Sequence, residues 1–116
     1  MEPLIKVLKC GSKAELLVKH FEIINVLLPD KELRITDREG QLLAEFIQKP
    51  GEKFSTKNKR LVREAIQMNK ISLDNHIKRM KAKGLIYEKE DGLLDIVSWI
   101  VPDFDTHLKY EIYVQV

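Results

Sequence analysis

The strongest structural signal in this chain is the stretch KISLDNHIKRMKAKGLIYEKEDG at residues 70–92. Ser72 is a suitable N-cap, because its hydroxyl can accept a hydrogen bond from a free amide of a first helical turn. The apolar residues after it recur at helical spacing and form one stripe: Leu73, Ile77 and Met80. Gly84 tolerates a left-handed backbone at low cost and is expected to end the helix. The pattern therefore predicts a helix from Ser72 to Lys83.

A β-hairpin is predicted directly after this helix. Residues 85–87 (LIY) begin a short strand, Glu90-Asp91-Gly92 forms a tight turn, and residues 93–97 (LLDIV) return. The tip of this hairpin is acidic, since Lys89 is its only basic residue and stands among Glu88, Glu90 and Asp91.

Three further helices are predicted upstream. Ser12 with Glu15 forms a capping box, and the apolar helix that follows ends at Pro29. Thr36 with Glu39 forms a second capping box, and its helix stops at residues 49–51 (KPG). Ser55 or Thr56 then caps a helix with an apolar face, and residues 68–70 lead into the next helix. Short strands are expected at residues 3–9, 52–55 and 108–116.

The order of these elements resembles the winged helix-turn-helix superfamily. The likeness rests on a basic helix, then Lys83-Gly84-Leu85-Ile86 and a charged hairpin, and it covers residues 36–99. It implies an α+β fold with a three-helix core and a β-hairpin wing. Residues 1–35 would form an N-terminal strand-helix extension that packs on this core, and residues 100–116 a C-terminal strand extension.

Length and composition fit one small globular domain. The chain has 116 residues, of which 44% are hydrophobic and 33% charged. No apolar run approaches the roughly 20 residues that cross a bilayer, and residues 1–6 do not resemble a secretion signal. A single cysteine, Cys10, excludes an internal disulfide. We therefore expect a reducing, cytoplasmic compartment and no membrane partner.

Positive charge is concentrated in the predicted helix-turn-helix. Residues 52–83 contain ten basic and three acidic residues, a balance of +7, whereas the whole chain carries only +2. The remaining residues therefore carry −5. A solvated lysine-rich surface is the alternative explanation, but the coincidence of charge and motif favours binding of nucleic acid.

The resemblance implies that the helix at residues 72–83 enters the major groove of double-stranded DNA. Base contacts are then expected from Asn75, which is placed in the first turn and can pair with adenine, from Arg79, which can fork onto guanine or clamp a phosphate, and from Lys78. Lys78 also suits a phosphate. Phosphate contacts are expected from the basic residues of the supporting helix and from the end of the recognition helix: Lys57, Lys59, Arg60, Arg63 and Lys81.

Each of these residues also has a structural interpretation. Asn75 could cap the helix further, and Arg79 could form a surface ion pair with Asp74. Asp74 itself repels phosphate unless it accepts from cytosine or orients Arg79, and it suits the positive end of the helix dipole better. His76 is expected to pack at the edge of the helix.

The functional hypothesis is therefore sequence-specific binding of double-stranded DNA by a small transcriptional regulator, with dimerisation through the terminal strand or helix elements. The alternative is a non-enzymatic winged-helix module for protein interaction or assembly, which the acidic hairpin favours. The aromatic residues near the C-terminus fill the core or form such an interface: Trp99, Phe104, Tyr110 and Tyr113. No enzyme motif, cofactor or metal site is expected; Asp103 and Asp105 could bind a cation but are typical of a solvated turn.

Overall fold

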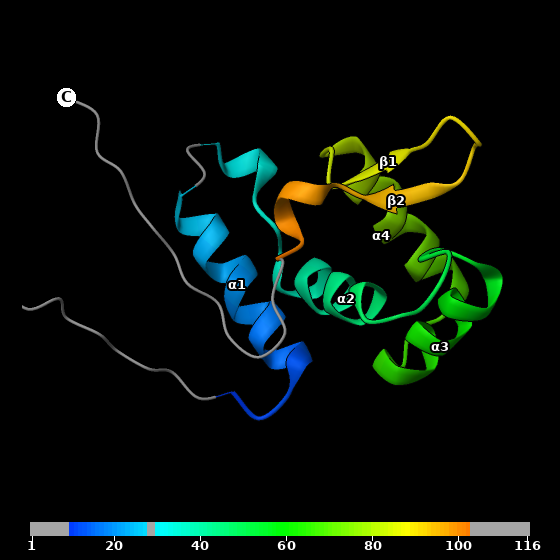
Figure 1. Cartoon of the computed structure of the whole chain (residues 1–116), viewed down its shortest axis with the longest axis horizontal. Coiled ribbons are helices and arrows are strands. Elements are labelled where there is room, and N and C mark those ends of the chain that lie inside the picture. Colours follow the sequence, from blue (N-terminus) through cyan, green and yellow to red (C-terminus); the bar gives the residue numbers. More distant parts are fainter. Residues whose placement is uncertain (1–9, 28–29, 103–116) are drawn as a thin grey trace, which may run out of the picture.

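The computed structural model describes residues 10–27 and 30–102, and within them the protein is α+β (Figure 1). Four α-helices precede one two-stranded antiparallel hairpin. The elements are α1 (Lys13–Leu27), the 3₁₀ turn η1 (Lys31–Leu33), α2 (Asp37–Ile47), α3 (Thr56–Ile66), α4 (Lys70–Ala82), β1 (Ile86–Glu88), β2 (Leu94–Ile96) and the 3₁₀ turn η2 (Ser98–Ile100). The strands predicted at residues 3–9 and 108–116 lie outside the described residues, as do Phe104, Tyr110, Tyr113, Asp103 and Asp105.

Side-chain caps fix the start of α2 and of α3. The Thr36 hydroxyl accepts from the Glu39 amide at 3.2 Å, and the Glu39 carboxylate accepts from the Thr36 amide at 2.9 Å. The capping box predicted there is confirmed. Ser55, rather than Thr56, caps α3, because its Oγ accepts from the Asn58 amide at 3.1 Å.

The predicted start of α4 at Ser72 is wrong. Asn69 is the N-cap, and its side-chain oxygen accepts from the Ser72 amide at 2.8 Å. Ser72 is therefore the third residue of the helix, and α4 begins at Lys70. Both residue types cap helices well, and they stand three positions apart, which is the spacing between a cap and the amide that it binds. Gly84 follows the helix with φ of +81°, as predicted.

One apolar core joins all four helices to the hairpin. The predicted stripe of α4 is confirmed, since Leu73, Ile77 and Met80 are buried. They belong to one core with residues from the other elements: Leu17, Phe21 and Ile24 of α1, Leu42, Leu43 and Phe46 of α2, Val62 of α3, and Ile86 and Ile96 of the hairpin. Because these residues share one core, α4 is held firmly on its inner side.

The strand predicted at residues 52–55 is also wrong, since this segment forms a turn. Phe54 is buried with its ring centroid 4.5 Å from that of Phe46. Side chains satisfy the carbonyls around it: Lys53 Nζ donates to Ile47 O, and Asn58 Nδ2 donates to Pro50 O and Glu52 O. Within the turn, Glu52 O is thus paired with the Asn58 side chain and with the Ser55 amide rather than with a partner strand.

The hairpin forms where the sequence predicts it, with shorter strands. Ile86 pairs with Ile96, Tyr87 with Asp95 and Glu88 with Leu94. The turn is closed by the Lys89 amide, which donates to Leu93 O at 2.8 Å, and by Gly92 at φ of +84°. Ile86 and Ile96 bury one side of the hairpin, and β1 packs against α4.

The helix α1 packs along α2 and also holds the end of the hairpin region. His20 Nε2 lies 3.2 Å from Ile100 O; a carbonyl oxygen only accepts, so Nε2 carries the proton. Burial lowers the pKa of His20 below 6.5, and the hydrogen bond to Ile100 opposes this shift. Trp99, beside Ile100, is 58% exposed and does not fill the core.

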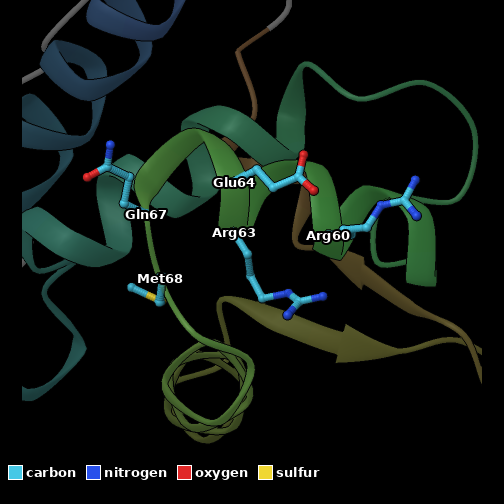
Figure 2. A pocket seen from close by; sticks show the side chains of 5 residues that line it. All are labelled: Arg60, Arg63, Glu64, Gln67 and Met68. Atoms are coloured by element: carbon cyan, nitrogen blue, oxygen red, sulfur yellow. The ribbon is translucent and has the colours of Figure 1, made fainter.

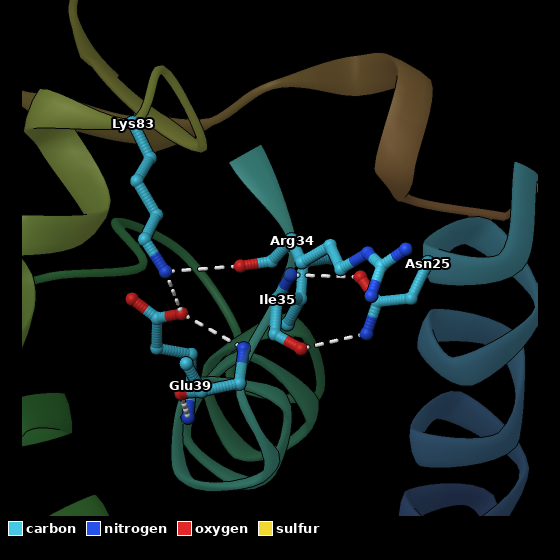
Figure 3. Close-up of polar contacts among 6 residues, drawn as sticks. Asn25, Arg34, Ile35, Glu39 and Lys83 are labelled. Atoms are coloured by element: carbon cyan, nitrogen blue, oxygen red, sulfur yellow. Dashed lines mark hydrogen bonds and ion pairs between the residues drawn. The ribbon is translucent and has the colours of Figure 1, made fainter. Parts of the chain in front are cut away.

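Figure 3 shows a polar clamp around the segment that leads into α2. On one side Asn25 of α1 exchanges two hydrogen bonds of 2.7 Å with the backbone of Ile35. On the other side Lys83, at the end of α4, donates to Arg34 O at 2.9 Å and to Glu39 Oε1 at 2.6 Å. The clamp therefore fixes the position of α1 and of the α4 C-terminus on the same short segment.

Candidate nucleic-acid interface

The outward face of α4 carries the three residues predicted to contact bases. Asn75, Lys78 and Arg79 are all exposed. At about 100° per residue they lie opposite the buried stripe that anchors the helix. The structure therefore presents these side chains together on one face of a helix whose other face is held in the core.

The structural interpretations of Asn75 and Arg79 do not hold. Asn69 already caps the helix, so Asn75 is not needed as a cap. The first-turn position predicted for Asn75 is also wrong, because α4 begins at Lys70 and Asn75 is its sixth residue, in the second turn. Among the described residues, Arg79 forms no salt bridge with Asp74. Both side chains are therefore available on the surface.

Two neighbouring residues of α4 are placed differently. His76 is half-buried, and its Nδ1–H donates to Ser72 O at 2.8 Å, as expected for the edge of the helix. Asp74 is the fifth residue of α4. The dipole predicted to favour it acts within the first turn, so that role is wrong for Asp74.

The basic residues at the end of α4 make contacts within the molecule. Lys81 Nζ lies 3.8 Å from Glu88 Oε2, and both side chains are about half exposed. Lys83 belongs to the polar clamp, with the carboxylate of Glu39 only 3% exposed. The charge of Lys83 is therefore used within the fold, whereas the charge of Lys81 is only partly neutralised by an exposed partner.

The predicted phosphate contacts of α3 fall into two pairs. Lys57 and Arg60 are exposed, whereas Lys59 and Arg63 are half-buried. Arg60 and Arg63 line an open hollow of about 200 Å³ together with Glu64, Gln67 and Met68. Figure 2 shows Arg63 extending from α3 into the space between α3 and α4, while Arg60 points away.

The guanidinium of Arg63 is incompletely paired. Its Nε atom is buried and has no hydrogen-bond partner among the described residues. An unpaired buried donor of this kind costs about 1–3 kcal/mol.

The hairpin tip, which lies within the described residues, is acidic and lacks the free basic side chains that would contact DNA. Lys89 Nζ lies 3.8 Å from Asp91 Oδ2, so its charge is partly neutralised. Asp91 Oδ1 also accepts from the Leu93 amide and holds the turn. The acidic character expected from the sequence therefore persists in three dimensions.

One residue of this surface is absent from the sequence-based prediction. Ile71, in the first turn of α4, is 76% exposed. A helix that begins at Ser72 leaves Ile71 outside it, which is why the residue escapes notice. Two signals in the sequence could have placed Ile71 on this surface. Asn69 as the cap extends the helix by two residues, and the apolar stripe that begins at Leu73 places Ile71 on the opposite face.

The described part of the chain shows no sign of two other classes of site. There, no group of three or more His, Cys, Asp or Glu side chains could hold a metal ion. None of the helices within residues 10–27 and 30–102 is long and apolar enough to cross a membrane.

Comparison with family models, with curated proteins and with solved structures returned no match to the chain.

Proposed function

We propose that this chain is a winged helix-turn-helix protein that binds double-stranded DNA at specific sequences and acts as a small transcriptional regulator. The order of the elements along the chain, α2, α3 and α4 followed by the hairpin, supports this proposal. Only residues 67–69 separate α3 from α4, as a helix-turn-helix requires. The proposal assigns no reaction and no cofactor to the chain.

The observation that carries the proposal is the outward face of α4, where Asn75, Lys78 and Arg79 are exposed above a buried apolar stripe. In the major groove Asn75 pairs with adenine and Arg79 forks onto guanine, the two contacts that suit an amide and a guanidinium. Lys78 contacts a base or a phosphate nearby.

The basic residues of α3 hold the DNA backbone in this arrangement. Lys57 and Arg60 are exposed enough to reach phosphates directly. Arg63 lines the hollow beside Arg60 and binds a phosphate there through the accessible part of its guanidinium. Lys59 and Lys81 attract the DNA backbone at longer range. Lys81 can contact a phosphate directly when its ion pair with Glu88 opens. Such contacts supply affinity and register but no sequence information.

A titration with fluorescent duplex of mixed sequence at 50 and 200 mM salt tests this function. A protein that neutralises several phosphates should lose affinity by roughly a thousandfold over this range. The double variant K78A/R79A should weaken binding and flatten the salt dependence by about one unit for each phosphate that it no longer neutralises. The matched control is K19A/R38A, which removes one exposed lysine and one exposed arginine from α1 and α2.

Equal weakening by the two double variants would show that α4 is not the binding surface. Arg79→Ala alone separates the two roles of that residue. A loss of about 1–3 kcal/mol confined to sites with a particular guanine indicates base reading. An equal loss on every sequence indicates a phosphate contact.

The second candidate is a non-enzymatic module for protein interaction or assembly. It is favoured by the paired Lys89 at the acidic hairpin tip and by the exposed apolar side chains of Val26, Leu27 and Trp99. Under this function the chain binds a protein partner or itself, through these residues or the terminal elements. Negligible affinity for duplex even at 50 mM salt, together with a dimer in analytical ultracentrifugation, would select it over DNA binding.

A further inference from the structure

Ile71 shares the outward face of α4 with the residues proposed to read DNA. Asn75, Lys78 and Ala82 follow it at i+4, i+7 and i+11, which is the spacing of one helical stripe. All four residues are exposed, and Ile71 retains 76% of its surface. A large apolar side chain therefore heads a stripe that is otherwise polar or small.

The major groove offers one apolar group to such a side chain, the C5-methyl group of thymine. The other groups on the DNA surface, the phosphates and the polar base edges, gain no stabilisation from contact with an isoleucine side chain. Lys70 and Lys78, both exposed, lie toward the same side of this stripe, where their ammonium groups can meet phosphates along one wall of the groove. Charge and apolar character on this face are therefore complementary to the floor and one wall of a major groove.

The spacing along the helix also limits where the thymine lies. Four residues span about 6 Å of α-helix, and base pairs stack about 3.4 Å apart. The base contacted by Ile71 is therefore expected within about two base pairs of the adenine contacted by Asn75.

We propose that Ile71 is a specificity-determining residue that packs its side chain against the C5-methyl group of a thymine in the target site. This inference rests on the proposed DNA-binding function. It adds a base preference that neither the charge pattern nor the polar residues of α4 supply.

The test uses the methyl group itself. Sites are first selected from a random duplex library with the full chain, and each thymine of the selected site is then replaced by deoxyuridine, which lacks only that methyl group. One replacement should weaken binding of the unaltered protein about fourfold, the loss expected for one buried methyl group. Ile71→Ala should bind both duplexes equally. The matched control Val26→Ala, at a residue of α1 that is 82% exposed, should retain the fourfold difference.

The possible outcomes distinguish a failure of the role of Ile71 from a failure of the proposed DNA binding. Specific binding that is indifferent to every deoxyuridine, or a methyl effect that survives in Ile71→Ala, overturns the role of Ile71 and leaves DNA binding intact. Binding without any selected sequence also overturns it. Failure to bind duplex at 50 mM salt removes both the role of Ile71 and the proposed DNA binding.

Discussion

Replacing Lys83 by methionine should destabilise the protein by about 2–3 kcal/mol. The ammonium group of Lys83 donates to Glu39 Oε1 at 2.6 Å and to Arg34 O at 2.9 Å. Methionine keeps an apolar stem of similar length and removes only the charge and its hydrogen bonds. It leaves the carboxylate of Glu39, whose side chain is 3% exposed, with the Thr36 amide as its remaining partner in the clamp.

The magnitude follows from the burial of the two partners. Removing one partner of a fully buried ion pair costs about 3–5 kcal/mol, because a charge is left without compensation. Lys83 retains 22% of its side-chain exposure, so water already screens part of the interaction and the expected cost is lower. At about 4 °C per kcal/mol, the midpoint of thermal unfolding should fall by about 8–12 °C.

The reverse substitution should cost less. Glu39→Gln keeps an oxygen for the Thr36 amide and leaves the partly exposed Lys83 able to reach water, so about 1 kcal/mol is expected. The double variant K83M/E39Q should be less destabilised than the sum of the single variants by about 1–2 kcal/mol. Urea unfolding followed by circular dichroism at 222 nm measures all four proteins.

Two results would refute this reasoning. A cost below about 0.5 kcal/mol for Lys83→Met would mean that the pair contributes nothing to stability. A larger cost for Glu39→Gln than for Lys83→Met would mean that the buried carboxylate is not the group left uncompensated.

Three further predictions concern the helices. Asn69→Ala should cost about 1 kcal/mol in urea unfolding and Ser72→Ala close to none, because Asn69 is the cap; the reverse order would restore Ser72 as the start of α4. Gln67→Gly should stabilise the protein by about 0.5–1 kcal/mol, since Gln67 adopts φ of +60° at the end of α3, and a loss of stability would show that its side chain is needed there. Stability should fall as the pH drops below 6.5, because the unfolded chain protonates His20 there while the folded chain, with its lowered pKa, resists protonation. Urea midpoints between pH 7.5 and 5 should show a smaller fall in His20→Gln, whose amide can still donate to Ile100 O, and an equal fall in both proteins would contradict the assignment.

The helices and the hairpin could be predicted from the sequence because their signals are local. Leu73, Ile77 and Met80 recur at helical spacing, and Thr36 with Glu39 forms a capping box within four residues. The start of α4 is misplaced in that prediction because Asn69 and Ser72 are both good caps at the distance that separates a cap from its bound amide. The local pattern alone does not show which of the two residues is the N-cap and which one donates its amide to that cap.

Other features could not be predicted because they depend on residues far apart in the chain. Lys83 and Glu39 are 44 positions apart, so nothing in the sequence separates this lysine from those facing solvent. The turn at residues 52–55 depends likewise on Phe54 packing against Phe46 and on the Lys53 and Asn58 side chains. The candidate interface was predicted through Asn75, Lys78 and Arg79, whereas Ile71 required the correct start of α4.

The most direct test of the central claim, that the outward face of α4 is the surface that meets DNA, is a nuclear magnetic resonance titration of the ¹⁵N-labelled chain with duplex. We predict that amide shifts concentrate in residues 69–82 and in residues 57–63 of α3, with α1 unaffected. Shifts confined to α1 and the region of Trp99, or none at saturating duplex in low salt, would contradict the claim.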